Sequence, residues 1–176
     1  MKGLIEDGLE SILITGTCFE YGNQSGPLSV RSETKPTNPY GFAKKSLYEE
    51  LKFLQSYKNF NLIWARLFYL YGEGQSQNSL YTSLKNAINS GEETFNMSGG
   101  EQLRDFLPVQ TVAKKIVDLT LKINNSKTVN ICSGVPISVR GLVEKLIDEN
   151  NWQINLNRGF YAYPDYEPMS FWGIDD

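Results

Sequence analysis

The sequence predicts an α/β fold with a mostly parallel sheet. Residues 11–15 and 62–68 form short, continuous apolar runs, which are typical of strands buried on both faces of a sheet. Apolar residues recur every three or four positions over residues 43–54 and 80–88, the spacing of helices with one apolar side. Strands that alternate with such helices favour a parallel sheet covered by helices.

The helix over residues 43–54 is expected to begin at Asn38 and Pro39, because Asn is a good N-cap and Pro suits the first helical position. Four further segments continue the alternation of strands and helices. They are a helix over 112–121, a strand over 128–132, a helix around 142–147 and a half-buried strand over 152–156.

Composition limits the possible functions. The chain has 176 residues, 40% of them hydrophobic, and a net charge of −3 without a cluster of Lys and Arg, so no nucleic-acid partner is expected. No apolar run is long enough to span a bilayer, and the N-terminus does not resemble a secretion signal, so we expect no membrane partner and a cytoplasmic location. Cys18 and Cys132 are too few and too far apart to indicate a disulfide framework or a zinc site.

The sequence contains no histidine. Ser-His and Cys-His nucleophiles and histidine-based metal sites are therefore excluded, and no metal is predicted. Proton transfer near neutral pH would have to use Tyr, Lys, Cys or a carboxylate.

Tyr40 and Lys44 lie four residues apart near the start of the first predicted helix, and hence on one face of it. A nearby ammonium group stabilises a phenolate, so such a pair suits proton exchange with a hydroxyl or carbonyl oxygen. The spacing alone does not select this pair, because it occurs twice more, in Tyr48 with Lys52 and in Tyr81 with Lys85.

The context of Tyr40 does select it. Thr17 directly follows a buried strand, and the carboxyl ends of strands are where open α/β sheets bind ligands. With Tyr21-Gly22 and Asn38-Pro-Tyr-Gly41, this segment resembles the extended short-chain dehydrogenase/reductase family, the NAD-dependent epimerase/dehydratase group with nucleotide-sugar 4-ketoreductase-like members. The resemblance implies that Thr17, Tyr40 and Lys44 are catalytic and that Tyr40 and Lys44 also contact the cofactor, NAD or NADP.

Later motifs extend the resemblance over the rest of the chain. Residues 66–72 resemble the segment that approaches the nicotinamide, which implies cofactor contacts for Leu67 and Phe68. By the same resemblance, Asn78 and Leu80 would contact the nucleotide of the substrate, and Arg104 would bind its diphosphate.

The resemblance also implies an architecture. The chain would hold the C-terminal half of a Rossmann-like parallel sheet and a small substrate-binding α/β region. Residues 1–74 would form the first part, with the catalytic Thr, Tyr and Lys. Residues 75–176 would form the second, with 128–148 returning to the sheet.

Three departures from the family pattern refine the expected function. The glycine-rich loop that holds the cofactor pyrophosphate occurs nowhere in the 176 residues, so this chain is expected to bind NAD(P) weakly and to be inactive alone. Cys18 and Phe19 replace the Asp-Glu pair of the 4,6-dehydratases, which disfavours dehydration. Tyr69 replaces an Asn that contacts the sugar nucleotide in many relatives.

The predicted function is therefore the catalytic and substrate-binding portion of a nucleotide-sugar 4-ketoreductase or C4-epimerase, expected to form homodimers. Two alternatives stay open: a non-catalytic remnant that binds a nucleotide sugar or dimerises, and a flavodoxin-like binding domain. The plainer interpretations of single residues also stay open: Thr17 could satisfy a loop amide, and Arg104 could form a surface ion pair with Asp105 or Glu101. The aromatic residues near the C-terminus could stack on a ligand or close a lid; they are Phe160, Tyr161, Tyr163, Tyr166, Phe171 and Trp172.

Overall fold

The computed structural model describes residues 2–122, 124–165 and 167–175. The helices are α1 (Lys2–Glu6), the 3-10 helix η1 (Cys18–Tyr21), α2 (Pro39–Gln55), α3 (Leu80–Asn89), α4 (Val109–Leu121) and α5 (Val139–Asn150). The strands are β1 (Ser11–Thr17), β2 (Gly26–Leu28), β3 (Asn61–Leu67), β4 (Tyr69–Tyr71), β5 (Thr94–Met97), β6 (Leu103–Arg104), β7 (Phe106–Pro108), β8 (Lys127–Ile131), β9 (Ile137–Ser138), β10 (Asn155–Arg158) and β11 (Phe171–Gly173).

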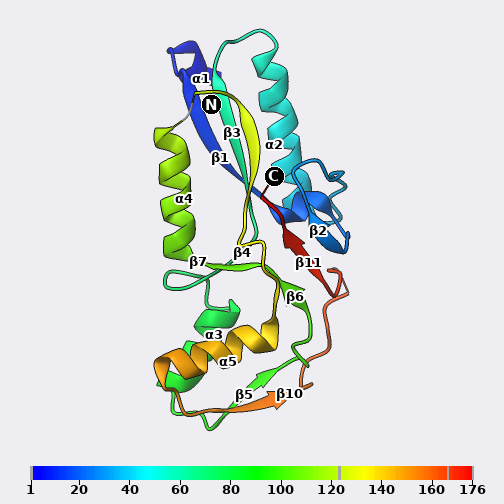
Figure 1. The fold of residues 1–176 in the computed structure, drawn as a ribbon, viewed down its shortest axis with the longest axis vertical. Coiled ribbons are helices and arrows are strands. Elements are labelled where there is room, and N and C mark those ends of the chain that lie inside the picture. Colours follow the sequence, from blue (N-terminus) through cyan, green and yellow to red (C-terminus); the bar gives the residue numbers. More distant parts are fainter. Residues whose placement is uncertain (1, 123, 166, 176) are drawn as a thin grey trace.

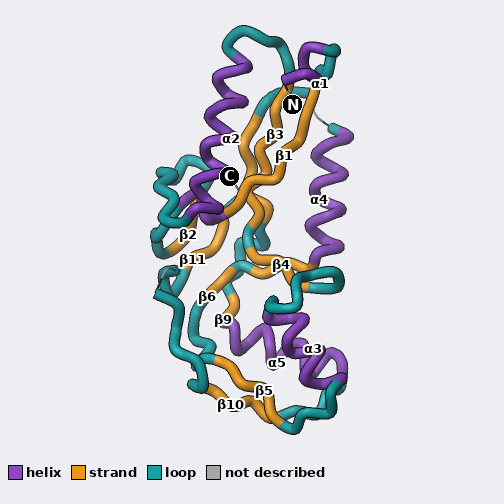
Figure 2. Tube along the Cα trace, turned by 180° about the vertical axis from the view of Figure 1, so that it is seen from behind, coloured by secondary structure: helices purple, strands orange, loops and turns teal. Residues whose placement is uncertain are grey.

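A three-stranded parallel sheet forms one end of the elongated molecule (Figure 1). Its strand order is β1-β3-β8, and α2 and α4 lie on opposite sides of it in both views (Figures 1 and 2). The central strand β3 carries Trp64 and Ala65, which are fully buried. A parallel sheet covered by helices confirms the predicted fold class.

Helix α2 begins where the sequence predicted. The side chain of Asn38 accepts a hydrogen bond from the Gly41 amide at 2.8 Å, and Pro39 occupies the first turn. Leu51 and Leu54 bury the inner face of the helix against Trp64 and its neighbours. The cap fixes where the helix begins, and the apolar face fixes how it packs on the sheet.

The other end of the molecule is a smaller α/β layer (Figure 2). Helices α3 and α5 pack on each other, and β5 pairs with β10 beside them. The core of this layer is fully apolar and consists of Leu84, Ala87, Phe95, Met97, Leu142, Val143 and Leu146. It has its own apolar cluster, separate from the residues buried around the sheet.

Short strand pairs connect the two ends. β4 pairs with β7 and β2 with β11, both parallel, and β6 pairs with β9 antiparallel. The fully buried carboxylate of Asp105 accepts hydrogen bonds from the amides of Ser133 and Gly134 at 2.7 and 2.9 Å. This contact fixes the segment that leaves β8 against the connection between β6 and β7.

The structure corrects the position of one predicted strand and adds short strands that the sequence did not predict, among them β4 and β7. The predicted strand over 152–156 is wrong in its position, because the strand is β10 at Asn155–Arg158. Trp152 and Ile154 still pack on the α3–α5 core. The alternating apolar residues Trp152 and Ile154 are therefore explained by packing on this core, although neither lies in a paired strand.

Two further points concern the extent of the structure. Of the aromatic residues near the C-terminus, Tyr166 lies outside the described residues.

None of the helices in the described part of the chain combines the length and the apolar character that a membrane span requires.

Candidate active site

Thr17 is the last residue of β1 and the N-cap of η1. Its hydroxyl accepts a hydrogen bond from the Phe19 amide at 3.3 Å, and the residue is 4% exposed. The plainer interpretation of Thr17, a hydroxyl that satisfies a loop amide, is therefore correct as far as the acceptor lone pair goes. A threonine hydroxyl has a proton to donate and a second lone pair besides this accepted bond.

Tyr40 and Lys44 lie beside this strand end. The Lys44 ammonium donates to the carbonyl oxygen of Thr15 at 2.8 Å and lies 5.9 Å from the centre of the Tyr40 ring. Tyr40 is 54% exposed, so its phenol is accessible. The structure thus brings Thr17, Tyr40 and Lys44 to the carboxyl end of β1, where open parallel sheets bind ligands.

The two other pairs with the same spacing lie elsewhere. The Tyr48 hydroxyl contacts Thr128 at 3.2 Å, and its ring packs on Trp64 inside the fold. Tyr81 and Lys85 both bind the exposed carboxylate of Glu73. Of the three pairs, Tyr40 and Lys44 alone stand beside Thr17.

Phe19 connects this strand end to a second group of residues. Its ring makes an edge contact with Tyr40 at 6.3 Å between centroids and another with Tyr69 at 6.2 Å. Tyr69 lies in β4, which leads away from the sheet. The aromatic series Tyr40, Phe19 and Tyr69 therefore runs from the exposed phenol toward the smaller layer.

A cavity of about 310 Å³ opens where that series ends. It lies between β4, the start of α3 and the start of α5, and its lining includes Tyr69, Leu80, Gln102, Arg104 and Glu167. Leu80 and Arg104, two of the residues expected to bind substrate, thus border one cavity. Asn78 does not line this cavity and is exposed just before α3.

Arg104 is paired inside the fold, so a surface ion pair with Asp105 or Glu101 is not what the structure shows. It is 2% exposed and donates to Glu167 at 2.8 Å and to the carbonyl oxygens of Leu103 and Met169 at 2.9 and 3.2 Å. Its guanidinium carbon also lies 4.6 Å from the centre of the Phe171 ring. These contacts hold the positive charge of Arg104 at the cavity wall.

Glu167 joins Arg104 to Tyr69. The Tyr69 hydroxyl donates to the second oxygen of the Glu167 carboxylate at 2.6 Å. Burial, together with the nearby Cys18 and Glu167, raises the pKa of Tyr69 well above its usual value, so this phenol stays protonated and acts as a donor. The cavity therefore presents a cation, a carboxylate and a phenol on one wall.

The residues expected at the nicotinamide, Leu67 and Phe68, follow the centre of the sheet. Leu67 is the last residue of β3 and is partly buried. The Phe68 side chain is 4% exposed and packs into a cluster with Cys18, Tyr21 and Phe171. Phe68 therefore points its ring into the core at this end of the sheet.

The two cysteines are buried thiols. Burial and the charge of Glu167 raise the pKa of Cys18 to about 12, and burial and the charge of Asp105 raise the pKa of Cys132 to about 12. Both are free thiols. Within the described residues, no three acidic or cysteine side chains are grouped closely enough to hold a metal ion.

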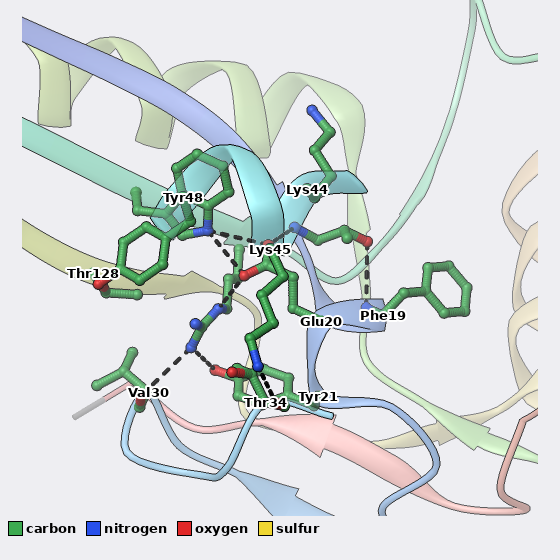
Figure 3. A network of polar contacts seen from close by, with 12 residues as sticks. Phe19, Glu20, Tyr21, Val30, Thr34, Lys44, Lys45, Tyr48 and Thr128 are labelled. Atoms are coloured by element: carbon green, nitrogen blue, oxygen red, sulfur yellow. Dashed lines mark hydrogen bonds and ion pairs between the residues drawn. The ribbon is translucent and has the colours of Figure 1, made fainter. Parts of the chain in front are cut away.

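Behind Thr17 lies a buried polar network (Figure 3). The Glu20 carboxylate is fully buried and accepts hydrogen bonds from the Thr17 amide, the Trp64 indole and the Arg66 guanidinium. The Tyr21 hydroxyl completes the network by contacting Arg66 and Asn130.

Sequence reasoning missed Glu20, Phe19 and Glu167 as parts of the site. Glu20 has a readable signal, since its spacing from Thr17 is that of a capping box. Glu167 has none, because its partners Tyr69 and Arg104 are distant in sequence and are brought together only by the fold.

The arrangement is that of an α/β protein with a candidate ligand site at the carboxyl end of its sheet. The family model of the NAD dependent epimerase/dehydratase family matches residues 3–132 of the chain. The chain therefore belongs to the NAD-dependent epimerase/dehydratase family.

Individual relatives agree with this assignment. A curated dTDP-6-deoxy-L-talose 4-dehydrogenase (NAD(+)) from Aggregatibacter actinomycetemcomitans is 31% identical over 174 residues, 98% of this chain and 64% of the relative. The chain thus spans somewhat less than two thirds of that relative's length.

Two solved structures share the fold. A UDP-N-acetylglucosamine 4-epimerase from Methanobrevibacter ruminantium M1, in complex with UDP-N-acetylmuramic acid, has a TM-score of 0.87 at 22% identity and covers 98% of this chain and 56% of its own. A UDP-glucuronic acid 4-epimerase from Bacillus cereus, in complex with UDP-glucuronic acid and NAD, has a TM-score of 0.82 at 20% identity and covers 98% and 55%.

Proposed function

We propose that this chain is the catalytic and substrate-binding portion of an NAD(P)-dependent oxidoreductase that acts at C4 of a nucleotide-linked sugar. The observation that carries the proposal is the position of Lys44. Its ammonium donates to the Thr15 carbonyl at 2.8 Å, which supports the choice of the Tyr40–Lys44 pair over the other two pairs.

Tyr40 is the proposed acid/base. Its side chain is exposed at the site, and the ammonium of Lys44 lies 5.9 Å from the centre of its ring. In the reducing direction Tyr40 gives its proton to the C4 oxygen of a 4-keto sugar, and in the oxidising direction it accepts that proton. Thr17 would donate a hydrogen bond to the same oxygen, since its hydroxyl has a proton to donate while it accepts from the Phe19 amide.

Arg104 and Leu80 would hold the nucleotide part of the substrate in the cavity. The Arg104 guanidinium is a planar donor that suits a diphosphate, and the aromatic series from Tyr40 through Phe19 to Tyr69 leads from the acid/base to the cavity. Asn78 would contact the nucleotide from the cavity's outer edge.

The residues present fit the nicotinamide side of the cofactor. Lys44 and Tyr40 would hold the nicotinamide ribose, and the backbone of Leu67 and Phe68 would border the ring at the end of β3. A bound nicotinamide dinucleotide supplies the hydride exchange at C4. The glycine-rich loop for its pyrophosphate is absent from these 176 residues, so the chain itself is proposed to bind the cofactor weakly.

Oxidation or reduction at C4 is proposed in preference to dehydration. Cys18 and Phe19 follow Thr17, and Cys18 is a buried thiol whose pKa is raised to about 12, so neither residue can serve as an acid or base in an elimination. The 31% identical relative is named as a 4-dehydrogenase of a dTDP-6-deoxy sugar, which supports a ketoreductase or dehydrogenase and a deoxyhexose substrate.

The domain division at residues 1–74 and 75–176 and homodimer formation belong to the same proposal. Exposed aromatic residues on α2, Phe42 and Phe53, are available for contacts between copies. The second candidate function is a module that binds nucleotide sugars without redox turnover.

Calorimetric titration tests the proposal. We expect the chain to bind a dTDP-, GDP-, UDP- or CDP-linked hexose, Tyr40→Phe to retain that binding, and Arg104→Ala to weaken it by about tenfold to a hundredfold. Turnover is assayed with NADH or NADPH and the 4-keto form of the sugar that binds. Binding without turnover would favour the second candidate, and no binding of any sugar nucleotide would contradict both.

A further inference from the structure

The carboxylate of Glu20 is fully buried three residues after Thr17. A buried carboxylate is strongly unfavourable unless donors surround it. Its first oxygen accepts from the Thr17 amide at 2.8 Å, and its second accepts from the Arg66 guanidinium at 2.9 Å. The Trp64 indole donates to both oxygens at 3.1 and 3.0 Å. Glu20 therefore joins the end of β1 to the centre of β3.

All three partners of Glu20 are donors. A backbone amide, an indole and a guanidinium carry no acceptor at these atoms, so they need a group that accepts at both of its ends. An ionised carboxylate meets that need, whereas Gln would turn an NH₂ group toward donors. The side-chain type at position 20 is therefore dictated by what surrounds it.

The carboxylate of Glu20 occupies space that a side chain at Gly16 would fill. A Cβ atom at position 16 would lie 2.4 Å from a Glu20 carboxylate oxygen and 2.3 Å from the Trp64 indole nitrogen. Both distances are far below van der Waals contact, so any side chain there would displace the carboxylate.

Further contacts hold Arg66, the charged partner of Glu20 (Figure 3). Its guanidinium donates to the Tyr21 hydroxyl at 3.2 Å and to the Val30 carbonyl at 3.4 Å, and it lies 4.8 Å from the centre of the Tyr21 ring. The Tyr21 hydroxyl donates in turn to Asn130 in β8, at 2.7 Å. The anchor of Glu20 thus includes the third strand of the sheet.

The turn that carries Thr17 depends on this anchor. The Glu20 carboxylate binds the Thr17 amide, and the Thr17 hydroxyl binds the Phe19 amide, so the two side chains form a reciprocal capping box. These contacts use the amide of Thr17 and one of the two lone pairs of its hydroxyl, which also has a proton to donate.

We propose that Glu20 is a positioning residue, which holds Thr17 through its amide so that the Thr17 hydroxyl donates to the reacting oxygen. The inference about the reacting oxygen rests on the proposed function. The anchoring of the turn rests on contacts within the chain alone, and the two parts are tested separately.

Amide hydrogen exchange tests the anchoring without any ligand. In Glu20→Gln we expect the Thr17 and Phe19 amides to exchange at least about tenfold faster. The Thr17 amide loses its carboxylate acceptor, and the Phe19 amide donates to the Thr17 side chain that this contact holds in place. Asp105→Asn is the matched control. Asp105 is an equally buried carboxylate that holds the turn after β8, and its substitution should speed exchange at Ser133 and Gly134 while leaving Thr17 and Phe19 unchanged.

Glu20→Asp is the milder second variant, since it keeps the charge and withdraws the carboxylate by one methylene. It should speed exchange at Thr17 and Phe19 by a smaller factor than Glu20→Gln. Unchanged protection of the Phe19 amide in both Glu20 variants would overturn the proposal.

A double-mutant cycle tests whether Glu20 acts through Thr17. Thr17→Val and Glu20→Gln should each weaken binding of the sugar nucleotide by about tenfold, and the double variant should bind no more weakly than the weaker single variant. In the parallel cycle, the effects of Asp105→Asn and Thr17→Val on the free energy of binding should be additive.

The outcomes separate the two claims. Additive losses for Glu20→Gln and Thr17→Val would overturn the positioning role, because Glu20 would then act independently of Thr17. Failure of the unsubstituted chain to bind any sugar nucleotide would contradict the proposed function instead, and the exchange measurement would still decide whether Glu20 anchors the turn.

Discussion

Two buried Arg–Glu pairs at the site differ in what surrounds them. In the Arg66–Glu20 pair, the side chains are 5% and 0% exposed, and protein donors surround the carboxylate. In the Arg104–Glu167 pair they are 3% and 12% exposed, and both residues border the 310 Å³ cavity. The Arg66–Glu20 pair thus belongs to an enclosed hydrogen-bond network, whereas the Arg104–Glu167 pair lines a cavity.

The difference teaches how burial assigns a role to an ion pair. A buried pair enclosed on all sides cannot release either partner without leaving an unpaired charge in the core. A pair at a cavity wall can reach solvent or a ligand on its open side. The Arg66–Glu20 pair should therefore control stability, and the Arg104–Glu167 pair should control binding.

The largest expected effect follows substitution in the closed pair. Arg66→Met removes the guanidinium and leaves the fully buried Glu20 carboxylate without its cation, so the free energy of unfolding should fall by about 3–5 kcal/mol. Urea denaturation followed by circular dichroism measures this change. Lys85→Met, which breaks the exposed pair with Glu73, is the control and should hardly shift the urea midpoint.

An Arg66→Met protein as stable as the unsubstituted chain would break the comparison. It would mean that the Glu20 carboxylate takes up a proton or reaches water despite its burial, and that the network is not closed.

A smaller loss of stability is expected in the pair at the cavity. Arg104→Met leaves Glu167 at a partly open edge, where water can enter the cavity and solvate the carboxylate. The free energy of unfolding should fall by clearly less than in Arg66→Met, while affinity for the sugar nucleotide falls by about tenfold or more. Urea denaturation and calorimetry on the same preparations give both quantities.

Arg66→Met should show the opposite pattern under conditions where it remains folded, with a large loss of stability and a smaller loss of affinity. If Arg104→Met proved as destabilising as Arg66→Met and left affinity unchanged, the two pairs would share one structural role.

The comparison also shows how far the sequence could predict this molecule. The sheet strands and α2 with its Asn38 cap follow from local patterns, since each depends on residues near one another in sequence. The Thr17–Tyr40–Lys44 group was expected from the family resemblance, because the spacing of Tyr40 and Lys44 occurs twice more in the chain. Short strands such as β4 and β7 escaped prediction, because three residues carry no readable periodicity and their pairing is set by the chain around them.

The pair at the cavity escaped prediction for the same reason. Arg104 was expected to bind a ligand, but its partner Glu167 lies 63 residues away, and neither local spacing nor composition connects them. For the Arg66–Glu20 pair, the contact of Glu20 with Thr17 could be predicted from the capping-box spacing. The contact with Arg66 could not, because Arg66 is 46 residues from Glu20. Local signals therefore predict which turn forms, while long-range contacts decide which charges face one another.

The smallest expected effect concerns Cys18, whose pKa depends on burial and on the charges of Glu167 and Arg104. Burial and the Glu167 charge raise the pKa of its thiol from 9.0 to about 12. The unfolded chain therefore loses this proton at lower pH than the folded chain. The contribution to stability is fully present below about pH 9 and is lost as the pH rises from about 9 toward 12, at up to about 1.4 kcal/mol per pH unit.

Urea denaturation between pH 8 and 10.5 measures this dependence. Cys18→Ala should make the free energy of unfolding fall less steeply with pH, and Glu167→Gln should do so to a smaller degree, because burial is the larger cause of the raised pKa. Cys132 is retained in both variants, so its similar contribution cancels from the comparison. An identical slope in Cys18→Ala and the unsubstituted chain would show that this thiol ionises alike in the folded and unfolded states. Neither burial nor the charge of Glu167 would then raise the pKa of this thiol.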